Sequence, residues 1–197
     1  MHLSLDFWNT LYKSNSSFKM NRLDILKKAS LKRPEQIGHA ISSIGKWHNS
    51  VLMREFGKAL PAAAVNRLLY QTLGIPENEH DALYQQTLQL FASMPPQRMR
   101  HPDIEPLVHR AASKSILSNT TFIPGSAVSQ WLQREGWNFD FELYSDELGV
   151  GKPAAATFKR LLSEVRSRTG STEILHVGDD PDHDASSIPE IRSHILQ

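Results

Sequence analysis

The stretch ILHVGDDPDHD, residues 174–184, joins a short apolar run to a dense group of acids. Residues 174–177 are typical of a buried strand, and four carboxylates lie within the six residues that follow Gly178. Carboxylates this close repel one another unless water or a metal ion surrounds them. Oxygen-rich sites suit Mg²⁺, which keeps several waters and uses few protein carboxylates. The stretch therefore predicts a magnesium site just past the end of a core strand.

A calcium-binding loop is the rival interpretation of the same acids, because residues 180–184 resemble the opening of an EF-hand loop. The sixth position of that loop would be Ala185 rather than glycine, and the twelfth would be Ile191 rather than glutamate. Both positions are essential to the loop. The EF-hand interpretation therefore fails.

Three further motifs add reactive groups at comparable places. They are LDFWNTL at 5–11, ILSN at 116–119 and GKP at 151–153. Asp6 and Ser118 each follow an apolar run, where a polar residue is commonly only a turn cap. Lys152 lies at a predicted helix start, which disfavours a cation unless the cation serves a nearby anion. Carboxylates, a hydroxyl and an ammonium group are together suited to Mg²⁺ binding and to attack on phosphorus.

Strand-like and helical segments alternate in the second half of the chain, whereas the first half is helical after its first strand. The strand-like ranges are 2–6, 115–118, 139–144 and 174–177. The helical ranges are 18–31, 34–56, 61–73, 78–92 and 103–112, followed by 124–135, 153–168 and 182–191. Polar residues 13–17 and the run at 94–96 are predicted loops. Either residues 193–197 supply a last strand or that strand is missing.

This alternation predicts an α/β protein with a Rossmann-like three-layer core and a parallel sheet. The core would comprise residues 1–12 and 112–197, with an all-α cap subdomain, residues 13–111, inserted after the first strand. Ligands of open parallel sheets bind beyond the carboxyl ends of the strands. Asp6, Ser118 and Asp179 are predicted to meet there.

Composition narrows the functional classes. The chain of 197 residues has a formal net charge of +1, which supplies no field that selects nucleic acid or an acidic membrane. Because the chain contains no cysteine, both disulfides and thiolate catalysis are excluded. No apolar run approaches the length of a membrane-spanning helix, and the N-terminus does not resemble a signal peptide. We expect a cytoplasmic protein that binds neither nucleic acid nor membrane.

The order and spacing of the four motifs resemble the haloacid dehalogenase superfamily of hydrolases. The resemblance covers about half of the chain, and it implies phosphate ester hydrolysis with Asp6 as the nucleophile that becomes phosphorylated. Ser118 would donate a hydrogen bond to the transferring phosphoryl group, and Lys152 would offset its charge. The remaining implied residues are Thr10, which orders the loop, and Asn119, which faces substrate.

The resemblance also implies a set of magnesium ligands. Asp6, Asp179 and the backbone carbonyl of Trp8 would bind Mg²⁺ directly, and Asp184 would act through water. The substrate would be a small phosphorylated molecule, and opening and closing of the cap would gate its access. The oligomeric state is not readable from the sequence.

The pattern departs from the phosphatase branch of the superfamily at Trp8, where that branch has a second aspartate that moves protons. General acid–base groups typically contribute about 10²–10⁴-fold, so the replacement matters most for poor leaving groups. If the protein is a phosphatase, it is a slow one, one that uses good leaving groups, or one that borrows an acid from the insertion. Candidates for the borrowed acid are His39, His48 and Lys13.

Other branches give further alternatives. Dehalogenases of the superfamily need no metal, which the acids at 179–184 argue against. Phosphonate-cleaving members use an insertion lysine, for which Lys46 or Lys58 qualifies by position alone. A catalytically silent binding protein on the same fold is the remaining alternative. The basic residues of 19–33 are interpreted as the solvated face of an amphipathic helix.

Overall fold

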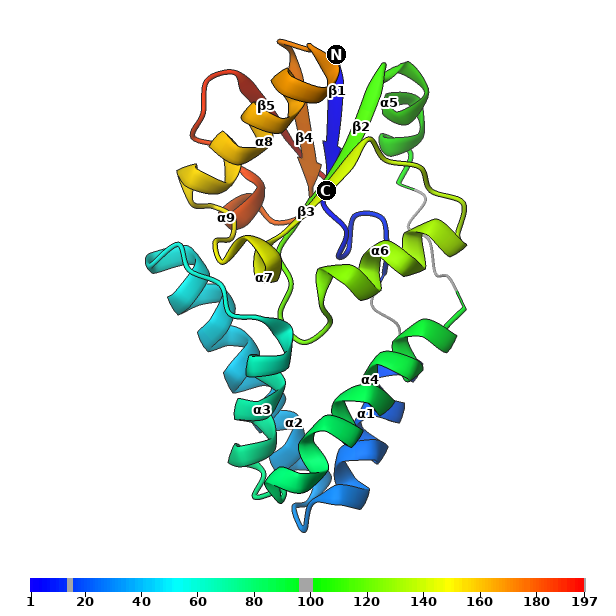
Figure 1. Cartoon of the computed structure of the whole chain (residues 1–197), viewed down its shortest axis with the longest axis vertical. Helices are drawn as coiled ribbons and strands as arrows, with labels where there is room; N and C mark the ends of the chain where they lie inside the picture. The colour runs from blue at the N-terminus through cyan, green and yellow to red at the C-terminus, as the bar shows by residue number, and fades with distance from the viewer. Residues whose placement is uncertain (14–15, 96–100, 197) are drawn as a thin grey trace.

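The computed structural model describes residues 1–13, 16–95 and 101–196, and it contains one sheet of five parallel strands (Figure 1). The strand order is β3-β2-β1-β4-β5. The strands are β1 (His2–Leu5), β2 (Ser113–Ser118), β3 (Phe141–Tyr144), β4 (Ile174–Gly178) and β5 (Ile191–Ile195). The parallel sheet predicted from the sequence is confirmed.

The register of the central strands brings the predicted reactive residues to one edge of the sheet. Leu5 at the end of β1 pairs with Ile116 of β2 on one side and with Val177 of β4 on the other. Asp6 continues this pairing, because its N–H donates to the carbonyl of Val177 at 2.8 Å. The residues that follow β1, β2 and β4 therefore leave the sheet side by side.

Helices cover both faces of the sheet, as successive strand residues point to opposite sides. On one face, α5 (Ile104–Arg110) and α6 (Gly125–Arg134) join a cluster that contains Leu3 and Leu5. On the other face, α8 (Ala155–Thr169) packs against Leu117 and Phe141. The resulting three-layer core agrees with the predicted fold class.

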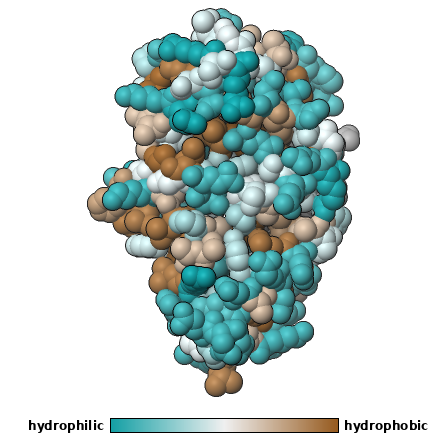
Figure 2. Space-filling model, viewed as in Figure 1, coloured by the Kyte–Doolittle hydropathy of each residue, from teal (hydrophilic) through white to brown (hydrophobic). Residues whose placement is uncertain are grey.

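The remaining helices form a bundle beyond the strand ends (Figure 1). They are α1 (Ser16–Ala29), α2 (Pro34–Lys46), the π-helix η1 (Trp47–Glu55), α3 (Ala62–Thr72), the 3₁₀-helix η2 (Glu77–Glu79) and α4 (His80–Ser93). The bundle has its own apolar cluster, which includes Leu26, Ile37 and Leu69. Figure 2 shows apolar side chains scattered over this face, several of them on the left near the middle of the molecule.

The predicted division between core and insertion stays a prediction. Helix α5 falls inside the predicted 13–111 cap, yet its Ile104 belongs to the same apolar cluster as Leu3 of the sheet. Below, "cap" means the helices from α1 to α4. None of the described helices is both long enough and apolar enough to cross a bilayer.

Three local expectations need correction. The helix predicted at 182–191 is only α9 (Pro181–Asp184), because the chain then extends to pair Ile191 with β4. The last strand begins at Ile191 rather than 193, and residue 197 of the expected range lies outside the described residues. Helix α7 (Ser145–Leu148) was not predicted. The loops predicted at 13–17 and 94–96 include undescribed residues, although α1 already begins at Ser16.

Candidate active site

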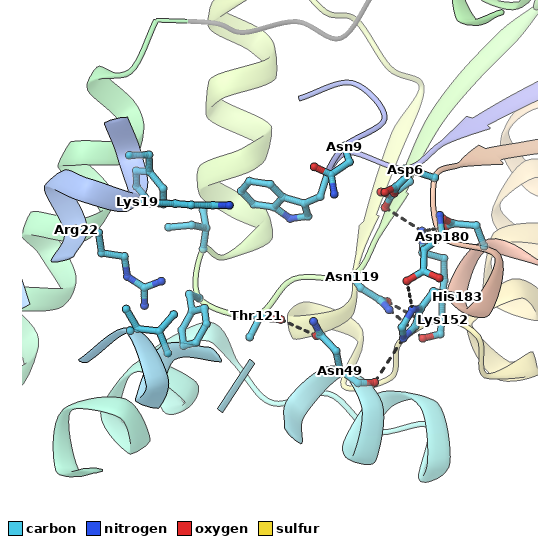
Figure 3. Close-up of a pocket in the computed structure, with 18 of the residues that line it drawn as sticks. Asp6, Asn9, Lys19, Arg22, Asn49, Asn119, Thr121, Lys152, Asp180 and His183 are labelled. Carbon is cyan, nitrogen blue, oxygen red and sulfur yellow. Dashed lines mark hydrogen bonds and ion pairs between the residues drawn. The ribbon is translucent and has the colours of Figure 1, made fainter. Parts of the chain in front are cut away.

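A buried lysine joins two of the predicted carboxylates. Lys152 is 1% exposed, and its Nζ donates to Oδ1 of Asp6 at 2.9 Å and also to Oδ1 of Asp184. Asp6 follows β1, Asp184 ends α9, and Lys152 lies in the loop before α8. Three segments that are distant in sequence thus meet in one ion-pair cluster, which Figure 3 shows at one end of a pocket.

The charges of this cluster are set by burial and by one another. Burial raises the pKa of Asp6 to about 6, and Asp184 contributes to the rise while Lys152 opposes it. Burial acts to lower the pKa of Lys152, but the two carboxylates outweigh it and hold that pKa above its ordinary value. Burial also acts to raise the pKa of Asp184, yet Lys152 and a neighbouring histidine hold it below its usual range. At neutral pH, all three groups are therefore charged.

Asn119 holds the backbone that carries Lys152. Its Nδ2 donates to the carbonyl of Lys152 at 2.9 Å, and its Oδ1 accepts the N–H of Lys152 at 2.8 Å. Gly151 permits this contact, because a methyl group there would lie 2.9 Å from Oδ1 of Asn119. Asn119 also lines the pocket. The predicted contact with substrate stays a prediction, whereas the clamp on Lys152 is a role that the sequence did not indicate.

Asp184 is fixed by a row of buried groups beneath it. His176 lies 3.2 Å from Oδ1 of Asp184 through Nε2 and 2.9 Å from Oγ of Ser4 through Nδ1. Because a carboxylate only accepts, Nε2 carries the hydrogen and Ser4 donates to Nδ1. The N–H of Asp180 donates to the other oxygen of Asp184 at 3.0 Å. A methyl group at Gly178 would overlap the Asp184 carboxyl group, so only glycine fits there.

His176, Ser4 and Gly178 are site residues that sequence reasoning missed. His176 and Ser4 occupy alternate positions in apolar strands, where a polar residue gives no sign of its partner. Their partnership would have been visible only from the parallel pairing of β1 with β4, which sets Ser4 opposite His176. That pairing follows from the strand order, and the sequence alone did not specify it.

Asp6, Asp179 and Asp184 form a candidate cation site. One carboxylate oxygen from each lies within 4.8 Å of the other two. Burial and the nearby Asp184 raise the pKa of Asp179, while the side chain of Asn9 acts against this rise. Asn9 has a φ of 55°, a left-handed conformation that asparagine tolerates. Three convergent carboxylates whose mutual repulsion a cation would relieve fit Mg²⁺, which prefers oxygen ligands.

The two hydroxyl groups predicted to take part lie in the interior of the protein. Thr10 and Ser118 are both buried, and neither hydroxyl has a hydrogen-bond partner of normal geometry in the described part of the chain. Ser118 is nevertheless close enough to Asp6 to favour its charged form. An unsatisfied buried hydroxyl is costly. A ligand oxygen beside Asp6 would give Ser118 the partner that it lacks.

Trp8 is part of an aromatic cluster rather than a charged one. Its ring lies 4.9 Å from that of Phe7, 5.6 Å from Tyr12 and 6.0 Å from Phe91, measured between centroids. In the turn that follows β1, the carbonyl of Phe7 accepts the N–H groups of Leu11 and Tyr12. The carbonyl of Trp8 accepts none of the turn's described hydrogen bonds, which leaves it available as the predicted metal ligand.

The candidate replacements for the missing acid lie elsewhere. His48 is buried, and its Nε2 accepts the N–H of Leu60 at 3.1 Å, so it holds the backbone. Neither His39 nor Lys13 is among the described residues that line the pocket, and the same holds for Lys46 and Lys58. His183 does line the pocket, and its Nδ1 donates to Asp180 at 2.7 Å.

The pocket is a cavity of about 650 Å³ between the sheet and the cap. Its core side carries Asp6, Asp179, Lys152 and their neighbours. Its cap side is formed by α1, α2 and η1, with Lys19, Arg22 and Asn49 among the polar residues. Figure 3 shows Lys19 and Arg22 at the opposite end of the pocket from Asp6 and Asp180.

No protein-family model matches the chain, and no curated protein matches it in sequence. Solved structures do resemble it. A protein from Thermotoga maritima assigned as a β-phosphoglucomutase is 13% identical, with a TM-score of 0.63 over 100% of this chain and 87% of that one. A 2-haloacid dehalogenase from Pseudomonas syringae is 18% identical, with a TM-score of 0.57 over 93% and 80%.

A third similar structure is a Bacillus subtilis protein assigned as a haloacid dehalogenase-type hydrolase and solved with bound magnesium. It is 15% identical, with a TM-score of 0.61 over 92% of this chain and 79% of that one. At these identities the likeness concerns the fold. The chain has the fold of the haloacid dehalogenase-like hydrolases, as its four motifs indicated.

Proposed function

We propose that this protein hydrolyses phosphate monoesters with the help of Mg²⁺, through a phosphorylated Asp6. The observation that carries the proposal is the convergence of three carboxylates within 4.8 Å beside the buried ammonium group of Lys152. A cluster with this balance of charge can accept both a divalent cation and a phosphate dianion. The cavity above it has the volume of a small-molecule site.

In the proposed reaction, a carboxylate oxygen of Asp6 attacks phosphorus, and the ester oxygen leaves with the bonding electron pair and takes a proton from water. Water then attacks the phosphorus of the aspartyl-phosphate, which releases inorganic phosphate and restores Asp6. Lys152 stabilises the negative charge that gathers on the phosphoryl oxygens. Ser118 donates its unused hydrogen bond to the same group.

The groups suited to hold Mg²⁺ are the carboxylates of Asp6 and Asp179 and the carbonyl of Trp8, with Asp184 behind them. When bound, the ion supplies positive charge that draws the phosphate toward Asp6. Because Trp8 cannot protonate a leaving group, we expect esters of acidic alcohols to react faster than esters of simple alcohols.

Dehalogenation is the second candidate function, and a specific likeness favours it, because a 2-haloacid dehalogenase is among the similar structures. That reaction also uses a carboxylate nucleophile but needs no metal. The acidic cluster around Asp179 argues against it, since a metal-free site gains nothing from gathering carboxylates. We therefore rank phosphate ester hydrolysis first.

Turnover of p-nitrophenyl phosphate tests the proposal. We expect activity that requires Mg²⁺, disappears with a chelator and is lost in Asp6→Asn. Asp24→Asn, which changes an exposed acid of α1, serves as the matched control and should retain activity. The leaving group of p-nitrophenyl phosphate needs little protonation, so the absence of an acid at Trp8 does not mask the reaction. Metal-independent release of halide from 2-chloropropionate, with no phosphatase activity, would replace the proposal by dehalogenation.

A further inference from the structure

We infer that the substrate carries a second anionic group, a carboxylate or another phosphate, which Arg22 binds at the cap end of the cavity. The inference rests on the proposed function, and it names the class of phosphate ester that the cavity admits. It comes from the charge that the cap leaves unpaired.

Arg22 belongs to the buried face of α1, between Phe18 and Leu26. Its side chain is 7% exposed, so Arg22 departs from the predicted solvated basic face, whereas Lys27 and Lys28 of the same helix are exposed as predicted. The spacing of these three residues, four apart, places them on one side of the helix. Arg22 therefore enters the interior of the molecule, and it does so where α1 lines the cavity.

The partners of the guanidinium group are neutral. It stacks over the ring of Phe122, 4.2 Å from the centroid, and its Nη2 donates to Oδ1 of Asn66 at 3.3 Å. Its Nε has no hydrogen-bond partner, and no described carboxylate pairs with Arg22. Burying a cation without a counter-charge is expensive. A purely structural tie between α1 and α3 would not need the charge.

The guanidinium group remains charged at neutral pH. Burial lowers the pKa of Arg22 to about 10, still far above neutrality. Lys19 lies one helical turn earlier on α1, lines the same cavity and adds a second positive charge. Figure 3 shows both residues on the cap side, with Asp6 and Asp180 across the pocket. The cap end thus attracts an anion while the core end holds the phosphate to be transferred.

The chemistry of the cavity defines the ligand further. Besides its charged groups, the lining includes the apolar side chains of Trp8, Phe122 and Ile123. A guanidinium group donates paired hydrogen bonds to a carboxylate or a phosphate. The ligand that satisfies both ends is therefore a phosphate ester with an apolar or weakly polar spacer and a second anion at its far end.

Matched pairs of esters test this inference. We would compare ω-carboxyalkyl phosphates of graded chain length with alkyl phosphates of the same length, and with the corresponding alkanediol bisphosphates. At the best chain length, we expect kcat/KM of the parent protein to be about tenfold or more higher for the ester with a second anionic group than for the matched alkyl phosphate. That ratio is the size of a charge-assisted contact. In Arg22→Gln, that ratio should fall toward one.

Controls keep the test independent of folding and of turnover. Arg67→Gln, which alters an exposed arginine of the cap, should leave the ratio unchanged, and Lys19→Gln should lower it modestly. Circular dichroism establishes that Arg22→Gln is folded. Calorimetric binding of the same esters to Asp6→Asn reports the cap contact when no turnover occurs.

The outcomes separate this inference from the proposed function. Hydrolysis or binding of every matched pair with equal efficiency would overturn the anion site and leave the phosphatase proposal intact. Absence of turnover, together with tighter binding of the carboxyalkyl esters that depends on Arg22, would support the anion site and count against the phosphatase proposal. Preference for the bisphosphates over the carboxylates would identify phosphate as the second anion.

Discussion

The two ends of the cavity treat charge in opposite ways. At the core end, the ammonium group of Lys152 is paired with the carboxylates of both Asp6 and Asp184. At the cap end, Arg22 is almost as deeply buried but has only Asn66 and an aromatic ring beside it. The difference shows which cation is neutralised within the protein itself. Lys152 is held by two carboxylates of the core, whereas the inferred second anion of the ligand would supply the charge that balances Arg22.

The largest effect should come from breaking the paired end. Lys152→Met leaves two buried carboxylates without their cation, which typically costs about 3–5 kcal/mol of stability. We also expect turnover of p-nitrophenyl phosphate to fall about 10²–10³-fold, because the variant loses a charge aimed at the phosphoryl group. Thermal unfolding and steady-state kinetics measure the two effects. A variant as stable as the parent would contradict the view that the core end depends on its ion pairs.

The close fit beneath Asp184 gives the next largest effect. A methyl group introduced by Gly178→Ala would overlap the Asp184 carboxyl group, and we expect a loss of about 3 kcal/mol or more from overpacking. Gly38→Ala is the matched control on the cap side, because nothing lies within 4 Å of a methyl group there. In a helix, that substitution should stabilise the protein by roughly 0.5–1 kcal/mol. Urea denaturation distinguishes the expected loss of stability in Gly178→Ala from the expected gain in Gly38→Ala.

Acid should weaken the core through His2. Burial lowers the pKa of His2 from 6.5 to about 4, so the folded state keeps this ring neutral while the unfolded chain protonates it. The stability that this difference contributes is complete above pH 6.5 and is lost as the pH falls toward 4. Between about pH 7 and pH 5 the loss should reach about 2 kcal/mol.

The contribution of His2 is isolated by comparison with His2→Gln. Glutamine keeps a donor and an acceptor for Ser113 and Ser115, which the ring contacts at 2.7 and 2.8 Å. The free energy of unfolding of this variant should fall less steeply between about pH 7 and pH 5. Parallel pH profiles for the two proteins would show that His2 titrates normally in the folded state.

The smallest effect concerns one of the direct contacts between the cap and the core. Arg54 of η1 pairs with Asp182 of α9 at 2.7 Å, but both side chains are half exposed. A double-mutant cycle with Arg54→Gln and Asp182→Asn should give a coupling energy of about 0.2–1 kcal/mol, weakened by salt. The pair Arg67 and Asp81 within the cap provides the comparison. A much larger coupling would mean that the cap is locked to the core even without ligand.

The reactive end of the cavity was predictable because its signals are local. Asp6, Ser118 and Asp179 each end an apolar run, and parallel strands bring such ends together. Helices of ordinary length were also found within a few residues of their bounds. The start of β5 was misplaced, and Ile191 was assigned to a helix, because the pairing of β5 with β4 is a long-range contact that no local pattern reveals.

The recognition end was not predictable for a related physical reason. Arg22 stands among several basic residues of one helix, and that setting is typical of a solvated surface. Its burial depends on Phe122, a residue one hundred positions away whose ring covers the guanidinium group. Asn119 is a similar case, since its amide binds a backbone segment that the sequence places far from it. The role of Arg22 exists only once the cap meets the core, and that of Asn119 only once distant segments of the core have come together.

The edge-to-face contact between Phe18 and Phe91, with centroids 6.0 Å apart, bears on how the chain folds. These residues lie near the start of α1 and the end of α4. A folded cap therefore already holds together the two points where the chain enters and leaves it. Pairing β1 with β2 across more than one hundred flexible residues would cost about 4 kcal/mol in chain entropy. A cap that forms first removes most of that penalty. The folded helices of the cap then keep β1 close to β2, so that the two strands can pair.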